Sequence, residues 1–449
     1  MNRRIGFLLY LLMLAAVAAG LGDMGVAHAG HFAPSQTEPG EEPSPTPETT
    51  PEPTPEPTPE PIPGSTPEAL LFLPLINEPY YTFLPAVNGR PALDAPHPVH
   101  NGARQSLNAY LAWEAVDPLL AGASYTIFLE RDDASPDEVV AAGITKTAFD
   151  PYTFEENTRY YWQVTAVNSA GQEVASAVWS FTTDFFPDIP ETDLMVEVPA
   201  GPFLMGCDGN NNGGYVCSNV DTPLHEVYLD AYQIDKHEVT NQEYRACVAA
   251  GACNAPRKEG SETRNSYFYD PAFDYYPVIY VSHWDAQDFC AWEEKRLPTE
   301  AEWEKAARGP IDTRPFPWGA EPWDCTWANH RCTTPDDTTR VDDFRRSQSP
   351  YGLLNVSGNV WEWVEDYYYD YYYTITPYAN PVLTVDMQDP NIPYFTVRGG
   401  CFRHAWWYLR TFHRKGGHWG DTIFDGSNDK PLFRSSIYGF RCAQSATSE

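Results

Sequence analysis

Nine cysteines are the residues of this 449-residue chain best able to do chemistry, and an odd number cannot all pair within one molecule. Pairing by position leaves Cys401 over, directly after the Arg398-Gly399-Gly400 turn and before His404 in an aromatic-rich segment. An unpaired thiol in an oxidising compartment is reactive, paired between molecules, or buried and inert. The state of Cys401 therefore decides between a redox enzyme and a binding protein.

The other eight cysteines stand where disulfides of a secreted domain are expected. Three pairs bracket short segments, and the remaining two cysteines would form a long-range link. Such a link would contribute on the order of 4 kcal/mol by restricting the unfolded chain. Spacing alone does not establish connectivity. The candidate pairs are Cys207 with Cys217, Cys247 with Cys253, Cys325 with Cys332, and Cys290 with Cys442.

Oxygen donors gather in residues 351–366 (YGLLNVSGNVWEWVED). Asn355 and Glu362 offer side-chain oxygens, while Gly358 and Val360 offer carbonyls in a loop tight enough to bring them together. Hard oxygen ligands at this spacing suit calcium. The alternative is a loop cross-linked by its own amides, with Glu362 in a salt bridge. The residues alone favour neither interpretation.

The elements that must position these groups belong to a unit at residues 193–445. Thr299 and Glu302 have the spacing of a capping box, which predicts a helix with Trp303 on its inner face. Residues 285–294 predict a second short helix. Gly, Pro, Asn and Asp are dense between the helices. We therefore expect an α+β unit with small sheets and much ordered loop.

The preceding residues 91–184 predict an all-β domain. Alternating segments occur at residues 111–113, 125–129 and 160–167, and a last strand at residues 178–182. The Tyr-x-Trp-x-Val strand, the Asn-x-x-Gly turn and the final Trp-Ser-Phe-Thr strand resemble a fibronectin type III domain. The resemblance implies a sandwich that serves as a spacer or adhesive module.

The N-terminal part reads as an export signal and a stalk. Arg3 and Arg4 precede an apolar stretch, and residues 27–29 (AHA) form a small-residue cleavage site, so residues 1–29 predict a signal peptide. Residues 30–68 are a Pro/Glu/Thr-rich stalk, and residues 69–90 form a linker. A membrane anchor is the weaker interpretation, because Gly and Asp residues interrupt the apolar stretch. We expect a secreted or cell-surface-associated protein without a transmembrane segment in the mature chain.

The charge balance limits the partners. The chain has 29 Lys and Arg against 62 Asp and Glu, a formal net charge of −33. Such a surface repels nucleic acid and anionic lipid, so neither is expected as a partner.

Several motifs of the C-terminal unit together resemble the formylglycine-generating enzyme family, also called the sulfatase-modifying factor family. They follow one another in order over roughly 250 residues. The resemblance implies the family's fold, a variant of the C-type lectin architecture with little regular secondary structure. The motifs are residues 198–206 (VPAGPFLMG), 225–230 (HEVYLD), 235–244 (DKHEVTNQEY), 296–304 (RLPTEAEWE), 316–319 (FPWG), 358–363 (GNVWEW), 397–400 (VRGG) and 439–442 (GFRC).

The resemblance also implies sites. It supports the pairing of Cys290 with Cys442, and it implies two calcium sites. The first matches Asn355, Gly358, Val360 and Glu362; the second matches Asn329 and His330, completed by Asp337 and Thr339.

The family's oxidase chemistry does not carry over. Members that oxidise a sulfatase cysteine bind copper(I) through two thiolates, three and eight residues after the position of Cys401. Here those positions hold His404 and Leu409, so no catalytic residue is assigned and copper is not expected. A site made from Cys401 and His404 would be a poor redox centre, because one thiolate and one imidazole lack further ligands.

The expected function is that of a secreted, calcium-stabilised binding or scaffold protein. Its partner would be an extracellular peptide, protein or carbohydrate, held by exposed aromatic and arginine side chains. The alternative is a formylglycine-generating-type oxidase, or a sulfatase-maturation enzyme, with a non-standard site. The expected surface consists of Arg403, Trp406, Trp407, Tyr408 and Arg410, with Phe402, Phe412 and Trp419 beside them.

Overall fold

The computed structural model describes residues 91–446, with gaps at 152, 188–190, 192–193, 320–323, 334–335, 388–393, 418–420 and 424–431. The predicted signal peptide (1–29), stalk (30–68) and linker (69–90), together with Trp419, lie outside the described residues. In the described part of the chain, no helix is long and apolar enough to cross a bilayer.

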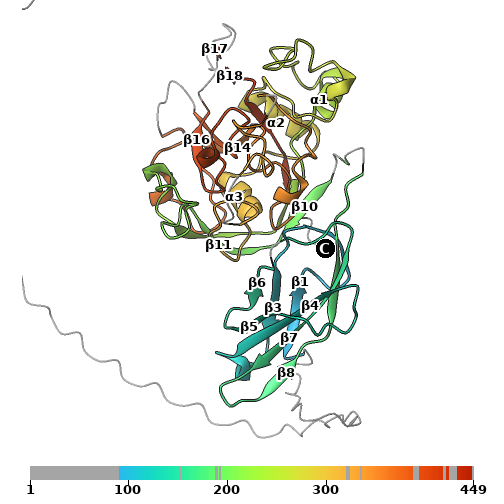
Figure 1. Cartoon of the computed structure of the whole chain (residues 1–449). Helices are drawn as coiled ribbons and strands as arrows, with labels where there is room; N and C mark the ends of the chain where they lie inside the picture. Colours follow the sequence, from blue (N-terminus) through green and yellow to red (C-terminus); the bar gives the residue numbers. More distant parts are fainter. Residues whose placement is uncertain are drawn as a thin grey trace, which may run out of the picture. The chain divides into compact units, whose positions relative to one another are not determined.

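The N-terminal described segment consists of strands that form two sheets around one core. One sheet has the order β1-β3-β6, and the other has the order β2-β9-β7-β4-β5, with β8 paired to β7. Figure 1 shows β4 and β7 side by side, as their antiparallel register requires. The strands are β1 (Leu93–His97), β2 (Gly102–Gln105), β3 (Leu111–Ala115), β4 (Ser124–Arg131), β5 (Val139–Ile144), β6 (Ala148–Phe149), β7 (Arg159–Val167), β8 (Glu173–Ala175) and β9 (Trp179–Thr183).

Alternating burial explains these strands. Every second residue of β4 faces the core, including Tyr125 and Ile127, and Trp162 and Val164 on β7 do the same. Trp113 on β3 packs edge-on against Tyr125, with ring centroids 5.2 Å apart. The two sheets therefore share a core of tryptophans and aliphatic residues, and the strands expected from the alternating pattern are present.

The C-terminal segment is rich in small sheets and has few helices. Its sheets have the orders β10-β13-β20, β11-β12, β16-β15-β14-β19 and β17-β18. The strands are β10 (Met195–Val198), β11 (Gly201–Met205), β12 (His225–Leu229), β13 (Tyr232–Asp235), β14 (Trp361–Tyr367), β15 (Phe395–Arg398), β16 (Arg414–Gly416), β17 (Asp421–Ile423), β18 (Leu432–Arg434), β19 (Tyr438–Phe440) and β20 (Ala443–Ser445). Among its described residues the helices are α1 (Asn241–Ala249), α2 (His283–Trp292) and α3 (Glu300–Arg308), with 3-10 helices η2 (Asn219–Asp221), η3 (Pro271–Phe273), η4 (Arg345–Ser347), η5 (Tyr372–Thr374) and η6 (Trp406–Tyr408). The 3-10 helix η1 (Pro118–Leu120) belongs to the N-terminal segment, between β3 and β4.

Capping boxes begin all three α-helices. Thr299 and Glu302 form the one that the sequence predicts for α3. Helix α2 begins two residues before the predicted start, because Ser282 is its N-cap and Asp285 completes the box. Helix α1 was not predicted, although Thr240 and Glu243 carry the same signal. A hydroxyl and a carboxylate three residues apart therefore mark the start of each of these three helices.

Disulfides fasten the loops between these elements. The structure pairs Cys207 with Cys217, Cys247 with Cys253, Cys290 with Cys442, and Cys325 with Cys332, and Cys401 is free and buried. The link between Cys290 and Cys442 spans 152 residues and ties α2 to the segment between β19 and β20. It therefore closes the C-terminal fold over most of its length.

Candidate functional site

The predicted catalytic positions lie in the loop that follows β15. Gly399 and Gly400 turn the chain with φ of 92° and 79°, values that favour glycine. A Cβ atom on Gly400 would lie 3.0 Å from both Leu409 Cδ1 and the Tyr408 carbonyl oxygen. The turn therefore brings Cys401 and Leu409 to opposite ends of one tightly packed loop that contains η6.

Cys401 and His404 form a neutral, buried pair in this loop. The thiol Sγ lies 3.3 Å from His404 Nδ1, and the indole Nε1 of Trp361 donates to the same nitrogen at 2.8 Å. Because an indole can only donate, Nδ1 is an acceptor and a neutral ring carries its proton on Nε2. Burial lowers the pKa of His404 to about 4, with Lys415 as a smaller cause. Burial raises the pKa of the Cys401 thiol to about 12, so this thiol stays protonated at neutral pH.

Leu409 stands at the second position and belongs to the core. It packs in an apolar cluster with Phe316, Trp318 and Ala328. Trp406 and Tyr408 cover the same cluster from η6. The position therefore contributes packing, and its side chain offers no atom to a metal or to a redox reaction.

The predicted ligand surface is smaller than expected. Arg403 is exposed, and Trp406, Trp407 and Tyr408 are half-buried. Arg410, however, is buried, so its assignment to the surface was wrong. Phe402 and Phe412 are also core residues, because each packs fully inside the domain.

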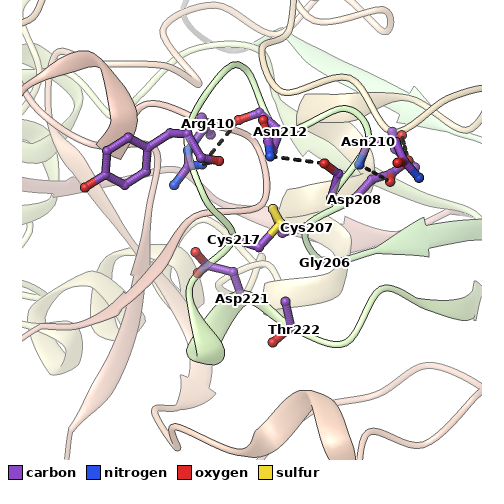
Figure 2. Close-up of a disulfide and its surroundings, with 12 residues drawn as sticks. Gly206, Cys207, Asp208, Asn210, Asn212, Cys217, Asp221, Thr222 and Arg410 are labelled. Atoms are coloured by element: carbon purple, nitrogen blue, oxygen red, sulfur yellow. Dashed lines mark hydrogen bonds between the residues drawn. A yellow bond between two sulfur atoms is a disulfide. The ribbon is translucent and has the colours of Figure 1, made fainter.

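Arg410 instead holds the loop closed by Cys207 and Cys217, as Figure 2 shows. Its Nη1 lies 3.3 Å from the carbonyl oxygens of both Asn212 and Tyr215. Its Nε donates to the carbonyl of Trp407 at 2.9 Å. One guanidinium therefore joins the disulfide loop to the aromatic segment.

Tyr215 is a surface residue that the sequence analysis missed. Its ring stacks on Trp407, with centroids 5.6 Å apart and an interplanar angle of 9°. Tyr215 is 47% exposed and the adjacent Val216 is 80% exposed. The pairing of Cys207 with Cys217 was predicted, but the spacing did not indicate which side of the fold the loop covers.

The residues of the first predicted calcium set contact other protein groups, as the alternative interpretation of a cross-linked loop with Glu362 in a salt bridge predicts. Glu362 accepts from Arg441 Nε and Nη2 at 2.7 Å each, and from Trp303 Nε1 at 2.7 Å. Asn355 Nδ2 donates to Glu238 Oε2 at 3.2 Å. Gly358 lies so close to Asn329 that a Cβ atom would be 2.3 Å from its carbonyl oxygen. The salt bridge neutralises the only carboxylate of the set, so these residues fit a calcium ion poorly.

The second predicted set contains a better indication of a missing ligand. Asn329 Oδ1 is buried, and among the described residues no hydrogen-bond donor reaches it. Asp337 is already neutralised in part, because Arg264 Nη1 lies 3.2 Å from its Oδ2. The His330 carbonyl accepts from Thr333 N at 2.7 Å. Among the predicted side-chain oxygens, Asn329 Oδ1 is therefore the one whose environment calls for a cation or a water.

Asn359 and Glu238 connect the two sets, and sequence analysis missed both. Asn359 Oδ1 accepts from Asn329 Nδ2 at 3.1 Å and from Thr339 N at 2.9 Å. Asn359 Nδ2 donates to Glu238 Oε1 at 2.9 Å. Burial, followed by the charge of Glu362, raises the pKa of Glu238 well above its usual range. Both residues stand inside motifs that the sequence analysis quoted, but only the fold shows that they meet.

A network of buried ion pairs supports this region from α3. Glu300 accepts from Arg398 Nη1 at 2.8 Å and from Arg414 Nε at 2.7 Å. Glu304 accepts from Arg398 Nη2 at 2.6 Å and pairs with Arg308 at 3.2 Å. All five side chains are fully buried. The arginine of the predicted turn before Cys401 is therefore anchored to two carboxylates of one helix.

Comparison with known proteins identifies the C-terminal unit. A family model described as a sulfatase-modifying factor enzyme 1-like domain matches residues 182–446. The formylglycine-generating enzyme of Streptomyces coelicolor is 30% identical over 299 residues, which cover 56% of this chain and 89% of that enzyme. The inactive C-alpha-formylglycine-generating enzyme 2 of Bos taurus is 28% identical over 222 residues, which cover 40% of this chain and 72% of that protein.

A second group of relatives shares only this unit. The serine/threonine-protein kinase pkn1 of Chlamydia caviae is 30% identical over 269 residues, or 56% of this chain. The match covers 38% of the kinase, so the chain spans little more than a third of that relative.

The ion-pair network predicts a large loss of stability for Glu300→Gln. The substitution leaves Arg398 and Arg414 buried beside a neutral amide, which should cost about 3–5 kcal/mol. Denaturant unfolding followed by circular dichroism measures this loss. The matched control is Glu155→Gln, because Glu155 pairs with Arg131 in an exposed bridge at 2.5 Å and should have no measurable effect. Equal effects of the two substitutions would contradict the assignment.

Proposed function

The chain belongs to the sulfatase-modifying factor family, and we propose that it is a binding or scaffold protein of that family without cysteine-oxidase activity. The proposal rests on the prediction that His404 and Leu409 stand where the family has two copper-binding thiols, and the observation that carries it is the burial of Leu409 in the core. Leu409 is buried among aromatic rings and cannot bind copper(I), which prefers thiolates.

The remaining thiol does not replace the lost pair. A thiolate is the form that binds metal or attacks a disulfide, and burial keeps Cys401 protonated. His404 Nδ1 is already engaged by Trp361 and by the thiol itself. The loop therefore supplies neither of the two thiolates that copper(I) chemistry in this family requires.

One relative supports this interpretation by its name. The match covers 72% of the Bos taurus relative, which is named an inactive C-alpha-formylglycine-generating enzyme. A relative whose name describes it as inactive therefore exists beside the relatives named formylglycine-generating enzyme, as we propose for this chain.

The proposed binding surface lies beside the substituted positions. It consists of Arg403, Trp406, Trp407 and Tyr408, extended by Tyr215 from the disulfide loop. Aromatic faces and an exposed guanidinium suit a peptide, a protein or a carbohydrate. Nucleic acid does not suit a chain with a net charge of −33.

We further propose that the protein is secreted or held at a cell surface. The support is the signal-like residues 1–29 and the stalk composition of residues 30–68. The two-sheet segment β1–β9, which resembles a fibronectin type III domain in its motifs, would act as a spacer.

Calcium is proposed as a stabilising ion at the set that contains Asn329. The support is the buried Oδ1 of Asn329 without a donor among the described residues. The carbonyl of Asp337 lies beside it, because it accepts from Asn329 Nδ2 at 2.9 Å. Amide and carbonyl oxygens are ligands that calcium accepts.

The oxidase assay tests the central proposal. The purified chain loaded with copper(I) should consume no oxygen with a Cys-x-Pro-x-Arg peptide, and Cys401→Ala should be equally silent. The Streptomyces coelicolor relative serves as the positive control under the same conditions. Oxygen consumption by the wild type that disappears in Cys401→Ala would establish the alternative, an oxidase with a non-standard site.

The surface proposal predicts that Trp407→Ala weakens a saturable interaction found on an array of extracellular glycans and peptides. Loss of a central aromatic residue should reduce affinity by about tenfold or more. Trp292→Ala is the matched control, because Trp292 is exposed on α2 and lies outside the surface. If neither variant changes binding, or the array shows none, the proposed surface is wrong.

Calcium removal tests the ion. Chelation should lower the melting temperature, because calcium at 100 times its Kd stabilises a protein by about 2.7 kcal/mol. In Asn329→Ala this calcium-dependent increment should disappear, whereas Asn210→Ala, an exposed amide of the disulfide loop, should keep it. A wild-type melting temperature that is independent of calcium would contradict the proposal.

A further inference from the structure

Cys325, His330 and Cys332 bring three metal-binding side chains together. One ligand atom of each lies within 4.8 Å of the other two. The cysteines form a disulfide, and Cys332 Sγ lies 3.1 Å from His330 Nε2. Two sulfurs and an imidazole are the donors that structural and catalytic zinc sites share. The predicted calcium set includes the His330 carbonyl, but neither that set nor the proposed function uses the two sulfurs or the His330 imidazole.

The exposure of this disulfide sets it apart. Cys325 and Cys332 are both exposed, whereas each of the other three disulfides has at least one buried cysteine. Cys207 is buried in one pair, and both members are buried in the pairs Cys247–Cys253 and Cys290–Cys442. Reduction begins when a thiolate attacks one sulfur, so access governs its rate. A dissolved dithiol therefore reaches the Cys325–Cys332 bond before the other three.

The loop is held in place by contacts that do not involve the disulfide. His330 is only 2% exposed, its N–H donates to Thr333 Oγ1 at 3.1 Å, and its carbonyl accepts from Thr333 N. On either side, the Arg331 N–H donates to the His404 carbonyl at 3.1 Å, and the Asn329 carbonyl accepts from Asn359 N at 2.8 Å. The imidazole and the backbone that carries Cys332 therefore keep their positions when the sulfur–sulfur bond opens.

We propose that reduction of the Cys325–Cys332 disulfide converts this loop into a zinc site with two thiolate ligands and the His330 imidazole. The reductant is a dithiol, whose two thiols become its own disulfide while two electrons and two protons pass to the protein sulfurs. Zinc then displaces those two protons as it binds. The ligand atoms must approach a centre with Zn–S of about 2.3 Å and Zn–N of about 2.0–2.1 Å.

Three protein ligands leave the fourth tetrahedral position open. Open positions distinguish catalytic zinc sites from closed structural ones, and they admit water or another small ligand. The site is therefore switched by redox state: the oxidised loop is a cross-link, and the reduced loop binds a thiophilic metal.

Mild reduction followed by cobalt binding tests this proposal on the full chain. Dithiothreitol is added in increments, with calcium in excess to occupy oxygen sites, and alkylation with mass spectrometry identifies the reduced cysteines. Cys325 and Cys332 should be alkylated first. Cobalt(II), a spectroscopic substitute for zinc, should then bind at one ion per chain with a thiolate-to-cobalt absorption band that the oxidised protein lacks.

Three variants make the result specific. Cys325→Ser/Cys332→Ser should lose the band. His330→Ala removes a direct ligand and should weaken cobalt binding by more than the roughly tenfold that loss of an outer-shell partner costs. Cys207→Ser/Cys217→Ser removes a different loop disulfide and should keep both the absorption band and the cobalt affinity of the reduced wild type. Circular dichroism confirms that each variant is folded.

Three outcomes would overturn the inference. They are absence of the band in the reduced wild type, an equal band in Cys325→Ser/Cys332→Ser, and reduction of the buried disulfides before this one. The oxidase and surface assays do not depend on this result, so failure here leaves the proposed function unaffected.

Discussion

The pairing of buried arginines with the carboxylates of α3 and β14 is the constraint on which the C-terminal unit depends. Glu300 and Glu304 hold Arg398 from β15, and Glu362 holds Arg441 from the segment after β19. Trp303 connects the two groups, since its ring lies under Arg398 and its Nε1 donates to Glu362. Small sheets bury too little backbone to fix such long loops. The ion pairs fix them instead, because a buried charge left without its partner would cost several kcal/mol of folding free energy.

Local patterns predicted the parts of this fold that are determined locally. Hydroxyl–carboxylate spacing located α3, and alternation located the strands around Trp113 and Trp162. Arg410 and Glu362 could not be placed in the same way. Their environments depend on partners far along the chain: 79 residues separate Glu362 from Arg441, and 198 separate Arg410 from Asn212. An isolated sequence window makes an arginine look like a surface residue, because burial follows only from a remote carboxylate or carbonyl.

The same distinction applies to the candidate site. The motif spacing predicts that His404 and Leu409 stand at the family's two thiol positions, and the structure adds what each side chain contacts there. The imidazole accepts from an indole, and the leucine fills a space between rings. Asn359 shows the opposite case. Its role depends on hydrogen bonds to Asn329 and Glu238, and the three residues belong to separate segments of the chain. The motif spacing therefore directed attention to single positions, whereas the connection between positions follows only from the fold.

The burial of Leu409 has an evolutionary consequence. A cysteine introduced at this position would lose methyl groups from a closely packed cluster, at a cost of about 2 kcal/mol before any metal could bind. Proteins keep only a small margin of stability, so this first step would be selected against. Core packing at Leu409 therefore opposes the introduction of a metal ligand at this position by a single substitution.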